Sequence, residues 1–194
     1  MSLLKSIQDG EGKTVEFKVE LPNGNTLAKT IIAFSNTGGG KLIIGVNDQG
    51  EIIGLEPDVN IFELKDKVAS IIYETCYPTV LPDIYTTTID DQLLLIIEVY
   101  RGNLLPYYLK NKGKNEGVYI RVGATNRKAS HENILELERQ RMNISFDQEA
   151  NREVELDSLD ISSLEGGFVR AGKVLDQPVM KNLKLVIEDN STLY

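Results

Sequence analysis

Apolar and polar residues alternate near the start of the chain and then recur at helical spacing. Val15, Phe17 and Val19 are separated by charged residues, and this pattern predicts a half-buried strand over residues 14–21 with Glu16 on its polar face. A helix is expected next, because apolar residues three and four positions apart form one continuous stripe. The stripe consists of Leu27, Ala28, Ile31, Ile32 and Phe34.

Three consecutive glycines follow this helix. Gly38, Gly39 and Gly40 permit backbone conformations with positive φ, which end a helix and let another molecule approach the main chain closely. A run of amides at such a corner can bind an anion such as phosphate. Glycines after a helix also serve simply to terminate it, so the sequence is consistent with either a phosphate-binding loop or a plain helix end.

Further strands and helices follow at short intervals. The expected strands cover residues 41–46, 51–55, 84–89, 92–100 and 118–122, and the expected helices run from about Asn60 to Cys76 and from Ser130 to Met142. The segments 41–46 and 92–100 are strongly apolar, which favours buried positions in a sheet. Residues 111–117 and 123–127 are expected to be loops. The fold class predicted is α/β (α+β), with a mixed β-sheet flanked by helices.

The composition changes after residue 142. Residues 143–194 contain ten acidic and five basic residues, and their first part is poor in large apolar side chains. We therefore expect one domain over residues 1–142. An acidic linker with a short helix near residues 157–164, and then the start of a truncated C-terminal region, would follow over 143–194.

The charge is distributed unevenly. The net charge of −8 argues at first against a nucleic-acid partner, because phosphate binding requires local positive potential. Residues 101–128 nevertheless carry seven basic residues and one acidic residue, a local charge of +6. The side chains expected to contact phosphate are Lys110, Lys112, Lys114, Arg121, Arg127 and Lys128. Tyr107, Tyr108 and Tyr119 lie between these bases and could stack on unpaired bases, although a solvated basic face and core tyrosines are the alternatives.

The residue content excludes several classes of site. One cysteine, Cys76, and one histidine, His131, exclude the familiar Cys/His zinc sites, and no Ser-His-Asp or Cys-His set is apparent. Lys41 follows glycines but opens a strand, whereas the lysine of a P-loop opens a helix. No apolar run approaches the roughly 20 residues that span a bilayer, and no secretory signal is apparent. We expect a cytoplasmic protein without a membrane partner.

Three acidic residues could form a metal site. Glu11, Glu16 and Asp48 would converge if the strand at 14–21 lies beside the strand at 41–46. Carboxylates are the ligands that Mg²⁺ or Mn²⁺ prefers, and a metal held there could activate water for phosphodiester cleavage. The alternative is that Glu16 pairs with a neighbouring base and that Asp48 only forms a turn.

Four segments of the chain, in order, resemble the AlbA-like, Schlafen-type domain. They are VEFK at 15–18, AFSNTGGGKLIIGVNDQGEIIG at 33–54, LPYYLK at 105–110 and YIRVGATNRKAS at 119–130. Such a domain opens many bacterial transcriptional regulators that have been described as RecG-related helicases or divergent AAA-type ATPases. The resemblance covers about residues 8–142.

The resemblance implies a DNA-binding domain of a transcriptional regulator, with DNA or RNA as partner. In animal Schlafens the related domain is an endoribonuclease that uses two glutamates and an aspartate, and Glu11, Glu16 and Asp48 would match them. The resemblance therefore also implies a metal-dependent ribonuclease as an alternative. Because animal Schlafens present two such lobes, a homo-oligomer is expected. An oligomerisation module and a divergent ATP-binding domain are further alternatives.

Overall fold

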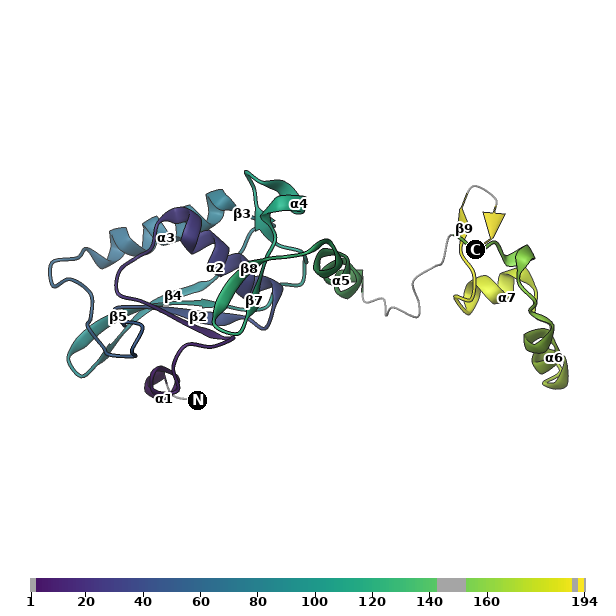
Figure 1. Cartoon of the computed structure of the whole chain (residues 1–194), viewed down its shortest axis with the longest axis horizontal. Coiled ribbons are helices and arrows are strands. Elements are labelled where there is room, and N and C mark those ends of the chain that lie inside the picture. The colour runs from purple at the N-terminus through teal and green to yellow at the C-terminus, as the bar shows by residue number, and fades with distance from the viewer. Residues whose placement is uncertain (1–2, 143–152, 190–191, 194) are drawn as a thin grey trace. The chain divides into compact units, whose positions relative to one another are not determined.

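The computed structural model describes residues 3–142, 153–189 and 192–193. It divides into two compact units, residues 1–142 and 143–194, which are described separately (Figure 1). The first unit contains a four-stranded mixed sheet in the order β1-β2-β5-β4. These strands are β1 (Val15–Lys18), β2 (Gly40–Ile44), β5 (Gln92–Val99) and β4 (Asp83–Ile89). β1 is parallel to β2, and the other two pairings are antiparallel.

Helices flank this sheet, which confirms the predicted fold class. On one face lie α2 (Gly24–Asn36) and α3 (Ile61–Thr75), whose apolar stripes pack with the sheet in the main core. On the other face α1 (Leu3–Gln8) places Ile7 against Phe17 and Ile43 in a second, smaller cluster. The strongly apolar strand β5 lies between β2 and β4, as its composition predicts.

A smaller group of elements completes the first unit. β3 (Cys76–Tyr77) pairs with β6 (Tyr108–Leu109), and the helix α4 (Gly113–Gly117) follows. β7 (Tyr119–Val122) and β8 (Thr125–Lys128) form a hairpin before α5 (His131–Met142). The expectation of loops at 111–117 and 123–127 was wrong, because residues 113–117 form the helix α4 and the polar residues 125–128 pair with β7. The expected strand at 51–55 is reduced to one bridge, between Val46 and Ile52.

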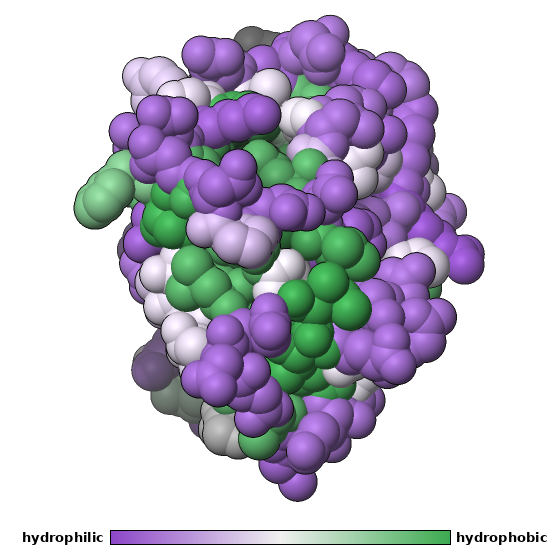
Figure 2. Space-filling model, turned by 90° about the vertical axis from the view of Figure 1, so that its left-hand side faces the viewer, coloured by the Kyte–Doolittle hydropathy of each residue, from purple (hydrophilic) through white to green (hydrophobic). Residues whose placement is uncertain are grey.

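Apolar side chains also reach the surface of the first unit. Figure 2 shows them as a band among hydrophilic residues on the side where β4 joins β5 and α3 begins. Ile53, in the segment before α3, and Phe62, in its first turn, are both exposed. Single exposed apolar residues are normal on protein surfaces, so this band by itself indicates no partner.

The second unit is built from short elements. They are a 3₁₀ helix (Leu156–Ser158), α6 (Ser162–Arg170), α7 (Gln177–Asn182), β9 (Glu188–Asp189) and β10 (Thr192–Leu193). Leu175, Met180 and Val186 form its small core. The single helix expected near 157–164 is replaced by the 3₁₀ turn and α6. Within the described residues, no helix is long and apolar enough to cross a membrane.

Asn36 joins the end of α2 to the smaller group of elements. Its buried amide donates to the carbonyl oxygens of Tyr107 (2.8 Å) and Tyr119 (2.9 Å), and its oxygen accepts from the N–H of Tyr107 (2.7 Å). One side chain therefore satisfies three buried backbone groups that β6 and β7 leave unpaired.

We expect Asn36→Leu to lower the free energy of unfolding by about 2–4 kcal/mol, because those backbone groups stay buried without partners. Urea denaturation followed by circular dichroism measures this. Ser35→Ala is the matched control, since Ser35 is equally buried but its hydroxyl donates to the Ile31 carbonyl oxygen of its own helix, and the substitution should cost less than about 1 kcal/mol. Equal losses in the two variants would contradict the role given to Asn36.

Candidate nucleic-acid interface

Arg121 lies in β7 with a completely buried side chain. Its guanidinium donates to the carbonyl oxygens of Gly12 (3.1 and 3.0 Å) and Val15 (3.0 Å) and to Oδ1 of Asn126 (2.9 Å). The fifth N–H is directed at Glu16, with which Arg121 forms an ion pair. All five donors of the guanidinium are therefore used inside the protein.

Glu16, the acidic partner in this ion pair, is buried as well. Only 6% of the residue is exposed, and its carboxylate also accepts from Thr30 Oγ1 (3.3 Å) and Asn126 Nδ2 (3.1 Å). Lys18 Nζ lies 3.5 Å from the same carboxylate. The cluster thus connects β1, α2 and the β7–β8 hairpin through charge-assisted hydrogen bonds.

These contacts correct two predictions. Arg121 was expected to contact phosphate, but its side chain is buried and its donors are occupied. Glu16 was expected on the polar face of its strand, and it is buried because Arg121 compensates its charge. An ion pair between residues 105 positions apart leaves no local pattern in the sequence.

The three acidic residues predicted to bind metal are not gathered into one site. Glu11 accepts a hydrogen bond from the N–H of Phe17 (2.7 Å), and Lys18 Nζ lies 4.0 Å from its carboxylate. Asp48 is exposed in a turn held by Asn47. Among the described residues, no group of three or more His, Cys, Asp or Glu could hold a metal ion. The acids do not fit Mg²⁺ or Mn²⁺, because Lys18 and Arg121 already supply cations to the two glutamates.

The glycine corner is used mainly for packing. The N–H of Gly39 donates to the carbonyl oxygen of Phe34 (3.0 Å) with φ at +76°, and a Cβ there would lie 2.7 Å from the carbonyl oxygen of Val99. A Cβ on Gly40 would lie 2.5 Å from the Phe34 ring. Both glycines are therefore required where α2 turns into β2. Binding of phosphate by Gly38, Gly39 and Gly40 stays a prediction, and Gly38 is the member with open space around it.

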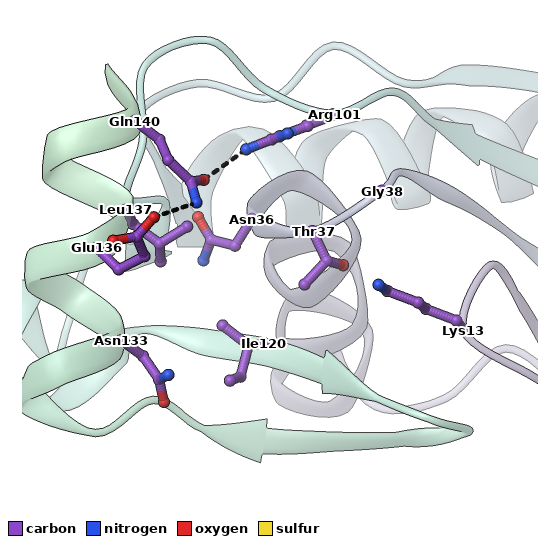
Figure 3. Close-up of a pocket in the computed structure, with 10 residues that line it drawn as sticks. All are labelled: Lys13, Asn36, Thr37, Gly38, Arg101, Ile120, Asn133, Glu136, Leu137 and Gln140. Carbon is purple, nitrogen blue, oxygen red and sulfur yellow. Dashed lines mark hydrogen bonds between the residues drawn. The ribbon is translucent and has the colours of Figure 1, made fainter. Parts of the chain in front are cut away.

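Gly38 lines a cavity of about 320 Å³ between the end of α2 and α5 (Figure 3). Lys13 points toward Thr37 from one side, and Arg101 donates to Gln140 Oε1 (2.6 Å) on the other. Gln140 in turn donates to Glu136 (2.8 Å). This hydrogen bond, and to a lesser extent the one from Arg139, holds the pKa of Glu136 below its usual value. The cavity therefore has cations at its rim and one ionised carboxylate.

The remaining predicted phosphate contacts lie at the surface. We call them the exposed basic set: Lys110, Lys112, Lys114, Arg127 and Lys128. Lys114 pairs with Glu138, and Lys128 pairs with Glu116 and thereby holds the pKa of that carboxyl below its usual value. Exposed ion pairs of this kind are weak and screened by salt, so a phosphate can replace the carboxylate.

Other side chains considered for chemistry are structural. Of the two alternatives for Tyr107 and Tyr119, stacking on bases or a place in the core, the structure shows the second, because both are buried in the core. Burial raises the pKa of the Cys76 thiol to about 11, so the thiol stays protonated and unreactive at neutral pH. His131 is exposed in the first turn of α5.

Comparison with known families decides what the first unit is. The family model described as "Schlafen, AlbA_2" matches residues 11–130, which is more than half of the sequence. The chain belongs to the Schlafen AlbA_2 family. The match spans β1 to β8, so the Schlafen AlbA_2 domain contains the Glu16–Arg121 cluster, the glycine corner and the exposed basic set. Membership of this family points to a function related to nucleic acids.

Two solved structures are similar to the chain. One is the DIP2311 protein from Corynebacterium diphtheriae, at 22% identity and a TM-score of 0.49, with 93% of this chain and 34% of that chain covered. The other is the N-terminal domain of a RecG-related protein from Nitrosomonas europaea. It has 24% identity and a TM-score of 0.47, with 66% of this chain and 91% of that chain covered. This chain thus spans about a third of the length of the first of these proteins. No curated protein matches the sequence.

The structure also shows candidate site residues of the Schlafen AlbA_2 domain that the sequence analysis did not identify. Lys13 lies outside the basic segment, and only the fold brings it to the cavity beside Gly38. Tyr73 and Tyr77 are well exposed, and Lys110 Nζ lies 5.2 Å from the centroid of the Tyr73 ring. A signal for Tyr73 was present, because it falls outside the apolar stripe of α3 and so had to face away from the core.

Proposed function

We propose that the Schlafen AlbA_2 domain of this chain binds nucleic acid, with the exposed basic set contacting the phosphate backbone. The observation that carries the proposal is the concentration of exposed cations in one segment of the domain, residues 101–128. Five exposed basic side chains come from β6, α4, β8 and their connections, and residues 101–128 contain only one acidic residue, Glu116. Such a concentration provides local positive potential despite the net charge of −8.

The wider role follows from the same proposal. A domain that holds phosphate through lysines and one arginine gives affinity with little base readout, since phosphate contacts position a protein but do not specify sequence. We propose that this chain serves as the nucleic-acid-binding part of a transcriptional regulator, in which other segments supply target choice.

Removal of Lys112 and Arg127, members of the basic set that form no ion pair with the described residues, tests the proposal. In Lys112→Ala with Arg127→Ala, affinity for a fluorescent oligonucleotide should fall by about tenfold or more in low salt, as measured by anisotropy. Lys65→Ala with Lys67→Ala changes the net charge equally on α3 and should leave affinity nearly unchanged. An equal loss in both variants would mean that only overall charge matters and would contradict the proposed interface.

Metal-dependent RNA cleavage has no such support. It would require Glu16 to leave Arg121 and Asp48 to approach the glutamates, and the described contacts favour neither movement. Incubation of the protein with structured RNA and Mn²⁺ distinguishes the two functions, since cleavage lost in Asp48→Ala would favour the enzyme.

A further inference from the structure

The end of α3 and β3 carry two tyrosines, Tyr73 and Tyr77, that the core does not use, and β6 carries a third, Tyr108, that is half-buried and packs partly against the core. Tyr73 is 64% exposed and Tyr77 is 50% exposed, whereas the core tyrosines, Tyr107 and Tyr119, are below 10%. We propose that Tyr73, Tyr77 and Tyr108, with Lys110, form a platform on which unpaired bases of a single-stranded nucleic acid stack. This inference rests on the proposed function and narrows its ligand to strands or loops with free bases.

The β3–β6 pair fixes two of these rings next to each other. Tyr77 and Tyr108 are directly opposite in the antiparallel register, so their side chains leave the same face of the two-stranded sheet. Their ring centroids are 5.3 Å apart, with an angle of 49° between the planes. Paired rings held by backbone hydrogen bonds present a preformed aromatic surface.

Tyr73 and Lys110 extend this surface toward α3. Lys110 Nζ lies 5.2 Å from the centroid of the Tyr73 ring and donates to the Tyr73 carbonyl oxygen (2.6 Å). The N–H of Lys110 donates to the carbonyl oxygen of Thr75 (2.9 Å), which ties the end of β6 to the end of α3. An ammonium group is therefore held beside an exposed aromatic face.

The chemistry of this surface matches an unpaired nucleotide. A base can stack on a tyrosine ring, while its phosphate meets a neighbouring cation. Lys112 and Lys114 follow Lys110 along the chain into α4, which Figure 1 shows beside β3. These lysines supply cations for further phosphates of the same nucleic-acid strand. A duplex keeps its bases stacked on each other, so it cannot use the rings in this way.

Stacking can be separated from charge by substitution of the two most exposed rings. Full-length protein is titrated with a fluorescent oligo(dT) of about 20 nucleotides and with a duplex of the same length. Tyr73→Ala with Tyr77→Ala should weaken single-strand binding by about tenfold or more and change duplex binding little. Tyr73→Phe with Tyr77→Phe keeps the rings and should bind like the wild type. Tyr100→Ala, an exposed tyrosine at the end of β5, should have no effect.

Each outcome bears on one proposal. Failure of the wild-type protein to bind either probe overturns the proposed function itself. Salt-dependent binding that is unchanged in the alanine variant leaves phosphate binding intact and overturns the platform. Binding that is weakened equally for single strand and duplex also overturns the platform, because stacking on free bases should affect only the single strand. The alanine variant should keep the wild-type dependence of affinity on salt, because no charge is removed. Thermal unfolding of each variant shows that the fold is retained.

Discussion

Arg121→Met should lower the free energy of unfolding by about 3–5 kcal/mol, the largest effect we expect from a single substitution in this domain. The variant leaves the buried Glu16 carboxylate without its buried cation, with only the partly exposed Lys18 nearby, and removes the hydrogen bonds to the carbonyl oxygens of Gly12 and Val15. Methionine fills similar volume, so the loss reports on the polar contacts more than on packing. Urea denaturation at neutral pH measures it.

Two variants control this experiment. Arg127→Met lies in the partner strand of the hairpin at an exposed position and should change stability by less than about 0.5 kcal/mol. Arg121→Met with Glu16→Leu removes both charges and should recover part of the loss, because an uncompensated buried charge costs more than a missing pair. If Arg121→Met is as stable as the wild type but loses affinity for nucleic acid, Arg121 contacts phosphate and the buried cluster is not its role.

Removal of four cations of the exposed basic set should reduce affinity for nucleic acid by about 10²–10³-fold at about 0.1 M salt. The variant carries alanine at Lys112, Lys114, Arg127 and Lys128. Each lost phosphate contact forfeits the release of close to one counterion, and these losses multiply in the binding constant. Anisotropy titration of a labelled oligonucleotide measures the change.

The second unit supplies a matched control. Alanine at Arg170, Lys173, Lys181 and Lys184 changes the net charge by the same amount but leaves the Schlafen AlbA_2 domain untouched. Affinity should then fall by no more than a few-fold, through the weak long-range effect of net charge. Losses of the same size in both variants would place binding outside the exposed basic set.

The main elements of the fold could be predicted because local patterns encode them. The apolar stripes of α2 and α3 have helical spacing, and the apolar run of β5 identified a central strand. The break between the strands expected at 84–89 and 92–100 coincides with the turn at Asp90 and Asp91, both of which have positive φ. β8 was missed because Thr125–Lys128 is polar and becomes a strand only through its pairing with β7.

The candidate site was predicted less well, because its chemistry depends on contacts between distant residues. The count of basic residues from 101 to 128 identified a charged surface correctly, but it could not distinguish Arg121 from its exposed neighbours. The alternation around Phe17 placed Glu16 in solvent, since nothing near it in the sequence indicates a buried cation. Burial of a charge is decided by its partner.

The most direct measurement of the central claim is the slope of log affinity against log salt concentration, from about 50 to 200 mM. For the wild-type chain we expect a steep negative slope. In the variant that lacks Lys112, Lys114, Arg127 and Lys128, the slope should be shallower by about three units. Each lost phosphate contact to a single strand accounts for about 0.7 of this change. A shallow wild-type slope, or one that the four substitutions leave unchanged, would contradict phosphate binding by the exposed basic set.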